Sequence, residues 1–125
     1  MLKTAIYGLG NWGQTLINSV HNKSDKIQIV QMITRDPSKY TEFAEKTGIP
    51  ISNDYEATLR SDAIDAVIIA TGHSVHGKHV EQAASAGKHI FCEKPFTLTK
   101  ESAVSAVEAC EKAGIKLAVA FNRRF

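Results

Sequence analysis

The chain has 125 residues, a length that suits one domain with a substantial buried core. Apolar residues make up 43% and charged residues 22%, as in an ordinary globular protein, and the net charge of +2 is too small to indicate binding to nucleic acid or to an acidic membrane. No apolar run reaches the roughly 18 residues of a membrane-spanning helix, and the first residues lack the long apolar segment and cleavage site of a signal peptide, so we expect a cytoplasmic protein.

A short apolar run at the start of the chain leads into a glycine-rich turn. Residues 2–7 read LKTAIY, and Gly8, Gly10 and Gly13 follow with the spacing GxGxxG. In a dinucleotide-binding turn the first glycine allows the bend, the second admits the pyrophosphate, and the third lets the next helix approach the strand. The N–H groups at the start of that helix would face the phosphates. The residues assigned to this contact are Gly8, Leu9, Gly10, Asn11, Trp12 and Gly13. A purely structural turn is the alternative.

Strand and helix patterns alternate along the whole chain. Apolar runs rich in β-branched residues predict strands at 2–7, 27–34, 49–51, 66–71, 89–92 and 116–121. Apolar residues at helical spacing predict helices at 14–21, 37–47, 54–59, 74–86 and 100–113. The alternation predicts an α/β fold, in which a doubly wound, mostly parallel sheet carries helices on both faces.

Two of these helices carry apolar residues that we expect to face the core. The predicted inward faces are Val75, His79, Ala83 and Ala86 on the helix at 74–86, and Ala103, Val107 and Cys110 on the helix at 100–113. Cys92 and Cys110 lack CxxC spacing and lie in apolar segments, so we expect free, buried thiols in a reducing compartment.

The end of the second predicted strand bears on which dinucleotide is bound. An acidic residue there usually binds the ribose 2′-hydroxyl of NAD, whereas the 2′-phosphate of NADP prefers an arginine and no carboxylate. Thr34 stands where the acid is expected, and Arg35 can stack on adenine or pair with a 2′-phosphate. Asp36 could be the ribose acid, but Pro37 follows it, so it makes a better cap for the next helix. We therefore expect NADP in preference to NAD.

The loop after the fourth predicted strand should face the ligand crevice, because ligands lie beyond the carboxyl ends of strands in such a sheet. This loop runs from Thr71 to His76, and His76 could contact the cofactor ribose. A solvated histidine at the start of a helix is the alternative. We expect no metal site, since neither a carboxylate nor a thiolate joins the histidines at 73, 76 and 79 as a further ligand.

Glu93, Lys94 and Pro95 follow the fifth predicted strand. A lysine beside a nicotinamide could orient a substrate hydroxyl and stabilise developing alkoxide charge. Glu93 could pair with Lys94 or accept a hydrogen bond from a ribose hydroxyl. An ordinary charged loop is the alternative for both residues.

Together these segments resemble a known family. The stretches AIYGLGNWG, ITRDP, the loop at 71–76, AGKHIFCEKPFTLT and FNRRF are similar to the nucleotide-binding domain of Gfo/Idh/MocA-type oxidoreductases. The resemblance covers residues 2–125. It implies a Rossmann fold and hydride transfer between a nicotinamide cofactor and a hydroxyl or carbonyl carbon, commonly of a sugar or cyclitol.

The resemblance also assigns roles to residues. It places the catalytic lysine of the family on Lys94, and cofactor contacts on Glu93, Thr34 and Arg35. The usual Thr-Pro-Asn-x-x-His pattern falls on residues 71–76, which adds Thr71 and His76 to the expected cofactor contacts. The residues that depart from that pattern are Gly72 in place of proline and His73 in place of asparagine.

Family members carry a second α/β domain that binds substrate and supplies much of the catalytic machinery, and nothing in these 125 residues corresponds to it. We therefore expect this chain to be the cofactor-binding domain of a longer protein or a truncated product, with the full form a homo-oligomer. The isolated chain should bind cofactor with little turnover. A stand-alone NAD(P)-binding or redox-sensing module is the alternative. A Rossmann-like domain for another adenine-containing ligand would leave Glu93, Lys94 and Pro95 without a role.

Overall fold

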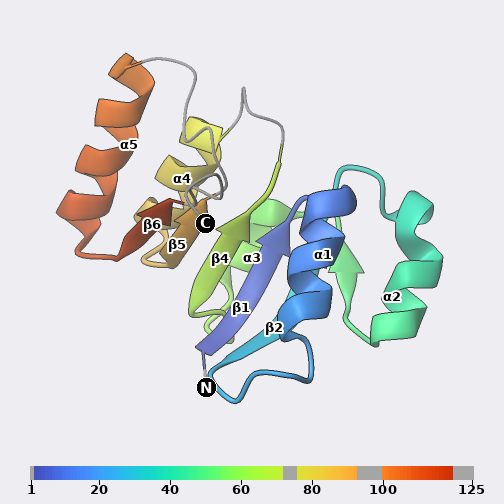
Figure 1. The fold of residues 1–125 in the computed structure, drawn as a ribbon. Helices are drawn as coiled ribbons and strands as arrows, with labels where there is room; N and C mark the ends of the chain where they lie inside the picture. The colour runs from blue at the N-terminus through green and yellow to red at the C-terminus, as the bar shows by residue number, and fades with distance from the viewer. Residues whose placement is uncertain (1, 72–75, 93–99, 120–125) are drawn as a thin grey trace.

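A computed structural model describes residues 2–71, 76–92 and 100–119 of the chain. Six strands form one sheet in the order β3-β2-β1-β4-β5-β6, and every pair of neighbours is parallel. The strands are β1 (Leu2–Tyr7), β2 (Ile27–Ile33), β3 (Ile51–Ser52), β4 (Ala66–Ile69), β5 (His89–Cys92) and β6 (Leu117–Val119). The helices are α1 (Asn11–Val20), the 3₁₀-helix η1 (Pro37–Tyr40), α2 (Thr41–Thr47), α3 (Tyr55–Arg60), α4 (His76–Ser85) and α5 (Lys100–Ala113). Figure 1 shows this arrangement.

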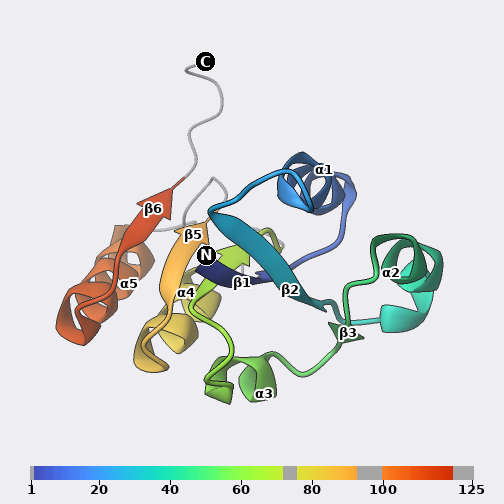
Figure 2. The same ribbon diagram turned by 90° about the horizontal axis from the view of Figure 1, so that it is seen from below.

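Helices cover both faces of the sheet, and each face has its own core. In Figure 2, α1 and α2 lie on one side of the sheet, and α3, α4 and α5 lie on the other. Neighbouring residues of β1 point to opposite faces, so that Ile6 packs with Ile17 of α1 while Ala5 packs with Val80 of α4. The predicted doubly wound α/β fold is therefore confirmed.

Element boundaries differ from the sequence prediction in two places that have clear causes. Helix α1 begins at Asn11 rather than Gln14, because Gly10 is its N-cap and its carbonyl accepts the Gln14 N–H at 3.0 Å. The edge strand β3 begins after Pro50 rather than at Ile49. Pro50 has no N–H to donate to a ladder, and it pairs with β2 only through its carbonyl, which accepts from Met32 at 2.8 Å.

The inward faces of α4 and α5 also differ from the prediction. Helix α4 buries Val80, Ala83 and Ala84, whereas Ala86 is exposed. Ala83 is buried as predicted, and Val80 and Ala84 lie beside it, whereas Ala86 lies beyond the end of α4 at Ser85. Helix α5 buries Ala106 and Cys110, while Val107 is 39% exposed. The prediction that Cys92 and Cys110 are free and buried is confirmed. Val75 lies outside the described residues.

The described helices cover one part of the sheet less completely than the rest. On the α1 side, an apolar hollow of about 710 Å³ lies over β4, β5 and β6, and Leu2 and Phe91 are each 36% exposed. Parallel sheets are usually covered on both faces, so the helices of the described segments leave this face incomplete. No helix in the described part of the chain is long and apolar enough to cross a membrane.

Two glycines bring strand β1, strand β4 and helix α1 into close contact. Gly8 has φ +109°, and a Cβ there would lie 2.4 Å from the Ala70 carbonyl oxygen. A Cβ on Gly13 would lie 2.1 Å from the Gly8 carbonyl oxygen. Both neighbours are backbone atoms, which cannot move aside without shifting a strand or a helix. The predicted roles of Gly8 in the turn and Gly13 in helix packing therefore have a direct physical basis.

We predict that Gly13→Ala destabilises the fold even though alanine normally stabilises a helix. The overlap with the Gly8 carbonyl should lower the free energy of unfolding by about 2 kcal/mol or more. The matched control is Gly10→Ala, because a Cβ on Gly10 meets nothing within 4 Å and should cost under about 1 kcal/mol as a weaker N-cap. Urea unfolding of both variants measures the difference. Equal stability of the two variants would contradict the packing role of Gly13.

Candidate functional site

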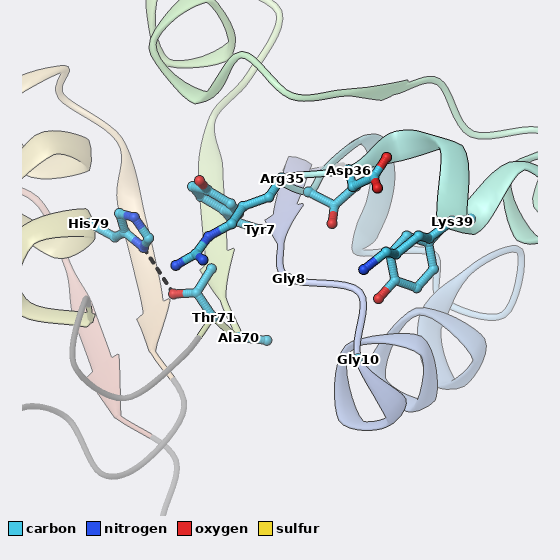
Figure 3. A pocket seen from close by; sticks show the side chains of 11 residues that line it. Tyr7, Gly8, Gly10, Arg35, Asp36, Lys39, Ala70, Thr71 and His79 are labelled. Carbon is cyan, nitrogen blue, oxygen red and sulfur yellow. Dashed lines mark hydrogen bonds between the residues drawn. The ribbon is translucent and has the colours of Figure 1, made fainter.

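The order of the sheet reverses between β1 and β4, and a hollow opens at their carboxyl ends. Its volume is about 480 Å³. Figure 3 shows its lining, which consists of Tyr7, Gly8, Gly10, Thr34, Arg35, Asp36, Lys39, Tyr40, Ala70, Thr71 and His79. In doubly wound sheets this reversal point is where ligands bind, because the following loops diverge and leave a crevice. Strands β1, β2 and β4 all end at this hollow.

Gly10 differs from the other two glycines of the turn. Its backbone is extended, with φ −65° and ψ −176°, a conformation open to other residues. No atom lies within 4 Å of where its Cβ would be. The N-cap position of α1 suits glycine but does not require it, whereas a phosphate passing close to the backbone would need that open space. The residues present therefore fit a pyrophosphate over Gly10.

The start of helix α1 adds a favourable charge beside Gly10. No side chain caps this ten-residue helix, and no acidic residue stands in its first turn. Because the positive end of the helix dipole is uncompensated there, it can stabilise an anion. The turn itself is braced by Gln14, whose side-chain amide donates to the Leu9 carbonyl at 2.9 Å. The Leu9 side chain is buried, so only its backbone can contact a ligand.

Two cationic side chains flank the hollow. Arg35 follows β2, and Lys39 comes from η1; both are exposed and line the hollow. In Figure 3 their side chains approach the glycine turn from opposite sides. Within the described part of the chain, neither side chain makes a hydrogen bond or a salt bridge. A ligand phosphate between them would meet two positive charges.

The carboxylate of Asp36, which also lines the hollow, is bound by Ser38. It accepts hydrogen bonds from the Ser38 backbone amide at 3.2 Å and from the Ser38 hydroxyl. The Ser38 hydroxyl contributes most to lowering the pKa of the Asp36 carboxyl below its ordinary value, and the Ser38 amide and the charge of Lys39 act in the same direction. The predicted role of Asp36 as a helix cap is confirmed, although the helix it caps is a single 3₁₀ turn.

An aromatic cluster forms the wall of the hollow beyond β1. The His79 ring stacks on Tyr7 with centroids 4.5 Å apart and meets the edge of Tyr55 at 5.3 Å. The Tyr55 hydroxyl donates to the His79 backbone carbonyl at 2.8 Å. Burial, with smaller contributions from Tyr7 and Cys92, raises the pKa of Tyr55, so its hydroxyl stays protonated. The Thr71 hydroxyl lies 2.9 Å from the His79 Nδ1.

The hollow brings together five of the residues that the sequence assigned to cofactor binding. These are Gly8, Gly10, Thr34, Arg35 and Thr71. Asn11 and Trp12 lie exposed on the first turn of α1, and Gly13 is buried against Gly8. Glu93 and Lys94 lie outside the described residues. His76 begins α4, and its side chain also lies outside what the structure describes.

Sequence reasoning missed several residues that line the hollow. They are Tyr7, Lys39, Tyr40, Ala70 and His79. The sequence could have predicted the place of Lys39, because the helix expected to start at Asp36-Pro37 puts this lysine about one helical turn from Arg35. His79 was assigned to an inward helix face, and nothing in its spacing indicated a bond to Thr71. Among the described residues, no group of three His, Cys, Asp or Glu side chains is arranged to hold a metal ion.

Comparison with known proteins agrees with this geometry. A family model described as "Oxidoreductase family, NAD-binding Rossmann fold" matches residues 2–121. The chain is 38% identical over 93 residues to D-xylose 1-dehydrogenase (NADP(+)) 2 of Haloferax volcanii, covering 74% of this chain and 29% of that protein. It is 34% identical over 125 residues to scyllo-inositol 2-dehydrogenase (NAD(+)) of Bacillus subtilis, covering 99% of this chain and 36% of that protein.

A solved structure shows the same fold. The crystal structure of a probable dehydrogenase from Thermotoga maritima matches with a TM-score of 0.92 at 27% identity, over 98% of this chain and 37% of that one. The chain thus spans about a third of the length of these relatives. The family match over nearly the whole chain, together with the Rossmann fold and its hollow at the reversal point of the sheet, shows that this chain belongs to the Gfo/Idh/MocA oxidoreductase family as an NAD(P)-binding Rossmann domain.

Proposed function

We propose that the chain is the cofactor-binding part of an NADP-dependent oxidoreductase that acts on a CH–OH group of a sugar, cyclitol or related small molecule. The observation that carries this proposal is Gly10, whose open surroundings at the N-cap of α1 fit a pyrophosphate. The cofactor would supply hydride transfer. The chain's own residues would bind it, orient it and select between its phosphorylated and unphosphorylated forms.

The pyrophosphate would lie on the turn at residues 8–13. Backbone N–H groups at the start of α1 would donate to its oxygens, and the helix dipole would stabilise its charge. The adenosine end would then extend toward the end of β2, where Thr34 and Arg35 line the same hollow. This direction follows from the position of the hollow between β1, β2 and β4.

The charges around the hollow favour NADP over NAD. Arg35 and Lys39 offer positive charge to a 2′-phosphate, and Thr34 stands where NAD-binding domains usually place an acid. The nearby carboxylate of Asp36 is held by Ser38, and the positive charge of Lys39 beside it partly offsets its negative charge. The Haloferax volcanii relative is named as an NADP enzyme, and the Bacillus subtilis relative as an NAD enzyme, so the family offers both solutions.

Catalysis would need more than this chain. By its resemblance to the family, Lys94 would contact the substrate hydroxyl near the nicotinamide, with Glu93 and His76 as cofactor contacts. Hydride transfer also requires the substrate to be held in line with the nicotinamide. A second domain of a longer, homo-oligomeric protein would supply that enclosure. The isolated chain would bind cofactor with little turnover.

We predict that the isolated chain binds NADPH at least about tenfold more tightly than NADH, as two cations meeting the 2′-phosphate would give about 1.4 kcal/mol or more. Arg35→Ala and Lys39→Ala should each weaken NADPH binding by about 5- to 20-fold and change NADH binding by less than about twofold. The fluorescence of Trp12, the single tryptophan, provides the titration signal beside the turn.

The matched control for these variants is Lys46→Ala, which removes the same charge from the last turn of α2, away from the hollow. It should leave both affinities unchanged. Tighter NADH than NADPH binding by the unmodified chain would contradict the assignment of NADP.

We predict that Gly10→Val abolishes binding of both dinucleotides while the protein stays folded. The valine side chain would occupy the space that the pyrophosphate needs. Its Cβ would have no protein atom within 4 Å, so the fold should tolerate the substitution. Fluorescence titration measures the affinity, and circular dichroism checks the fold. Retained affinity in a folded Gly10→Val variant would show that the cofactor does not lie on this turn.

We predict that Lys94→Ala, made in a longer protein that includes the substrate domain, lowers kcat by about 10²- to 10⁴-fold. NADPH affinity should change by less than about threefold, because the lysine acts on the substrate hydroxyl. Steady-state rates with NADP⁺ and either D-xylose or an inositol provide the assay. An equal loss in affinity and turnover would assign Lys94 to cofactor binding instead.

A further inference from the structure

We propose that His79 is a positioning residue, which fixes the hydroxyl of Thr71 at the carboxyl end of β4 for contact with the bound dinucleotide. The inference rests on the proposed function, since it takes the hollow to be the cofactor site. It adds a residue that neither the glycine turn nor the second strand supplies.

The first support is that the His79 ring is held firmly in place. It stacks on the Tyr7 ring at an interplanar angle of 24°. With the Tyr55 ring it makes an edge-to-face contact at an interplanar angle of 63°. Its backbone carbonyl accepts a hydrogen bond from the buried Tyr55 at 2.8 Å. The ring and backbone of this residue are thus anchored to β1 and α3, two elements that are remote from it in the chain.

The second support is the position of Thr71. It follows directly after Ala70, whose N–H donates to the Tyr7 carbonyl at 2.8 Å, so the backbone before Thr71 is fixed to β1. Thr71 and His79 line the same hollow as Gly8 and Gly10. In Figure 3 the bond between Thr71 and His79 lies at the edge of the hollow, on the side of Arg35. A ligand there would contact the hydroxyl that His79 orients.

The chemical consequence depends on the protonation of Nδ1. A threonine hydroxyl has one proton and two lone pairs. If Nδ1 of His79 is the unprotonated nitrogen, it accepts a hydrogen bond from the Thr71 hydroxyl, and the Thr71 oxygen can then accept one from a ribose hydroxyl or an adenine amine. If Nδ1 carries the proton, it donates to the Thr71 oxygen, and the Thr71 proton is directed elsewhere. His79 therefore sets whether Thr71 accepts from the ligand or donates to it.

A double-mutant cycle on the 125-residue chain tests whether His79 acts through Thr71. His79→Phe keeps a ring to stack on Tyr7 but removes Nδ1, and Thr71→Val removes the hydroxyl while keeping the shape. Each should weaken NADPH binding by about 5- to 10-fold, as expected for a lost hydrogen bond. The double variant should bind no more weakly than the weaker of the two single variants, because both remove the same interaction.

Two further variants separate positioning from a structural role. His79→Asn loses the stacking but carries an amide near the place of Nδ1, and it should recover part of the affinity lost in His79→Phe. Ile49→Val removes a buried methyl group from the core on the other face of the sheet, away from the hollow, and serves as the stability control. It should lower the melting temperature and leave the NADPH affinity of the folded protein within about twofold.

Additive effects of His79→Phe and Thr71→Val, or unchanged affinity in His79→Phe, would overturn the positioning role. Should His79→Phe fail to fold, His79→Leu, which also lacks Nδ1, takes its place in the cycle with Thr71→Val. Failure of the proposed function looks different, because the unmodified chain would then bind neither NADPH nor NADH. That result would overturn both proposals, whereas additivity in a chain that binds NADPH overturns only this one.

Discussion

The contact between the Gly8 carbonyl and Gly13 is the constraint on which the site depends. It lets the first turn of α1 pack directly against the end of β1. The corresponding contact of Gly8 with the Ala70 carbonyl packs the end of β4 against the same turn. With all three elements drawn together, the carboxyl ends of β1 and β4 and the positive end of α1 converge on one hollow. Gly10, between them in the chain, faces open space. The fold requires two of the glycines, and the proposed pyrophosphate would account for the third.

The charges around this hollow depend on the helix cap at Asp36 as well as on which residues are present. An acid after β2 would ordinarily repel a 2′-phosphate, and Asp36 lies next to Arg35 in the chain. The turn of η1 reduces this conflict: Ser38 holds the Asp36 carboxylate, which stays charged, and the same turn brings the positive charge of Lys39 to the hollow. Pro37 is what makes so tight a turn favourable. A cap that looks purely structural thus has an electrostatic consequence for the neighbouring site.

The sequence predicted those parts of the site that depend on short-range rules. Glycine spacing, the alternation of strands and helices, and the Asp36-Pro37 helix start each reflect the local backbone, and the structure agrees with all three. What it could not predict depends on how distant elements meet. The inward face of α5 includes Ala106 rather than Val107, because the angle at which a helix meets its neighbours sets its buried stripe. The bond from His79 to Thr71 likewise requires α4 to return alongside the end of β4.

The two ends of the hollow therefore use different physical means. At the glycine turn, recognition would come from backbone groups and a helix dipole, which serve any dinucleotide and tolerate few substitutions. At the ends of β2 and β4, side chains would decide which ligand fits, and two of them are held by hydrogen bonds: Asp36 by Ser38 of the same turn, and Thr71 by His79 of α4. Under the proposed function, a change of cofactor preference would need changes only at this second end, because the 2′ position would lie away from the glycine turn.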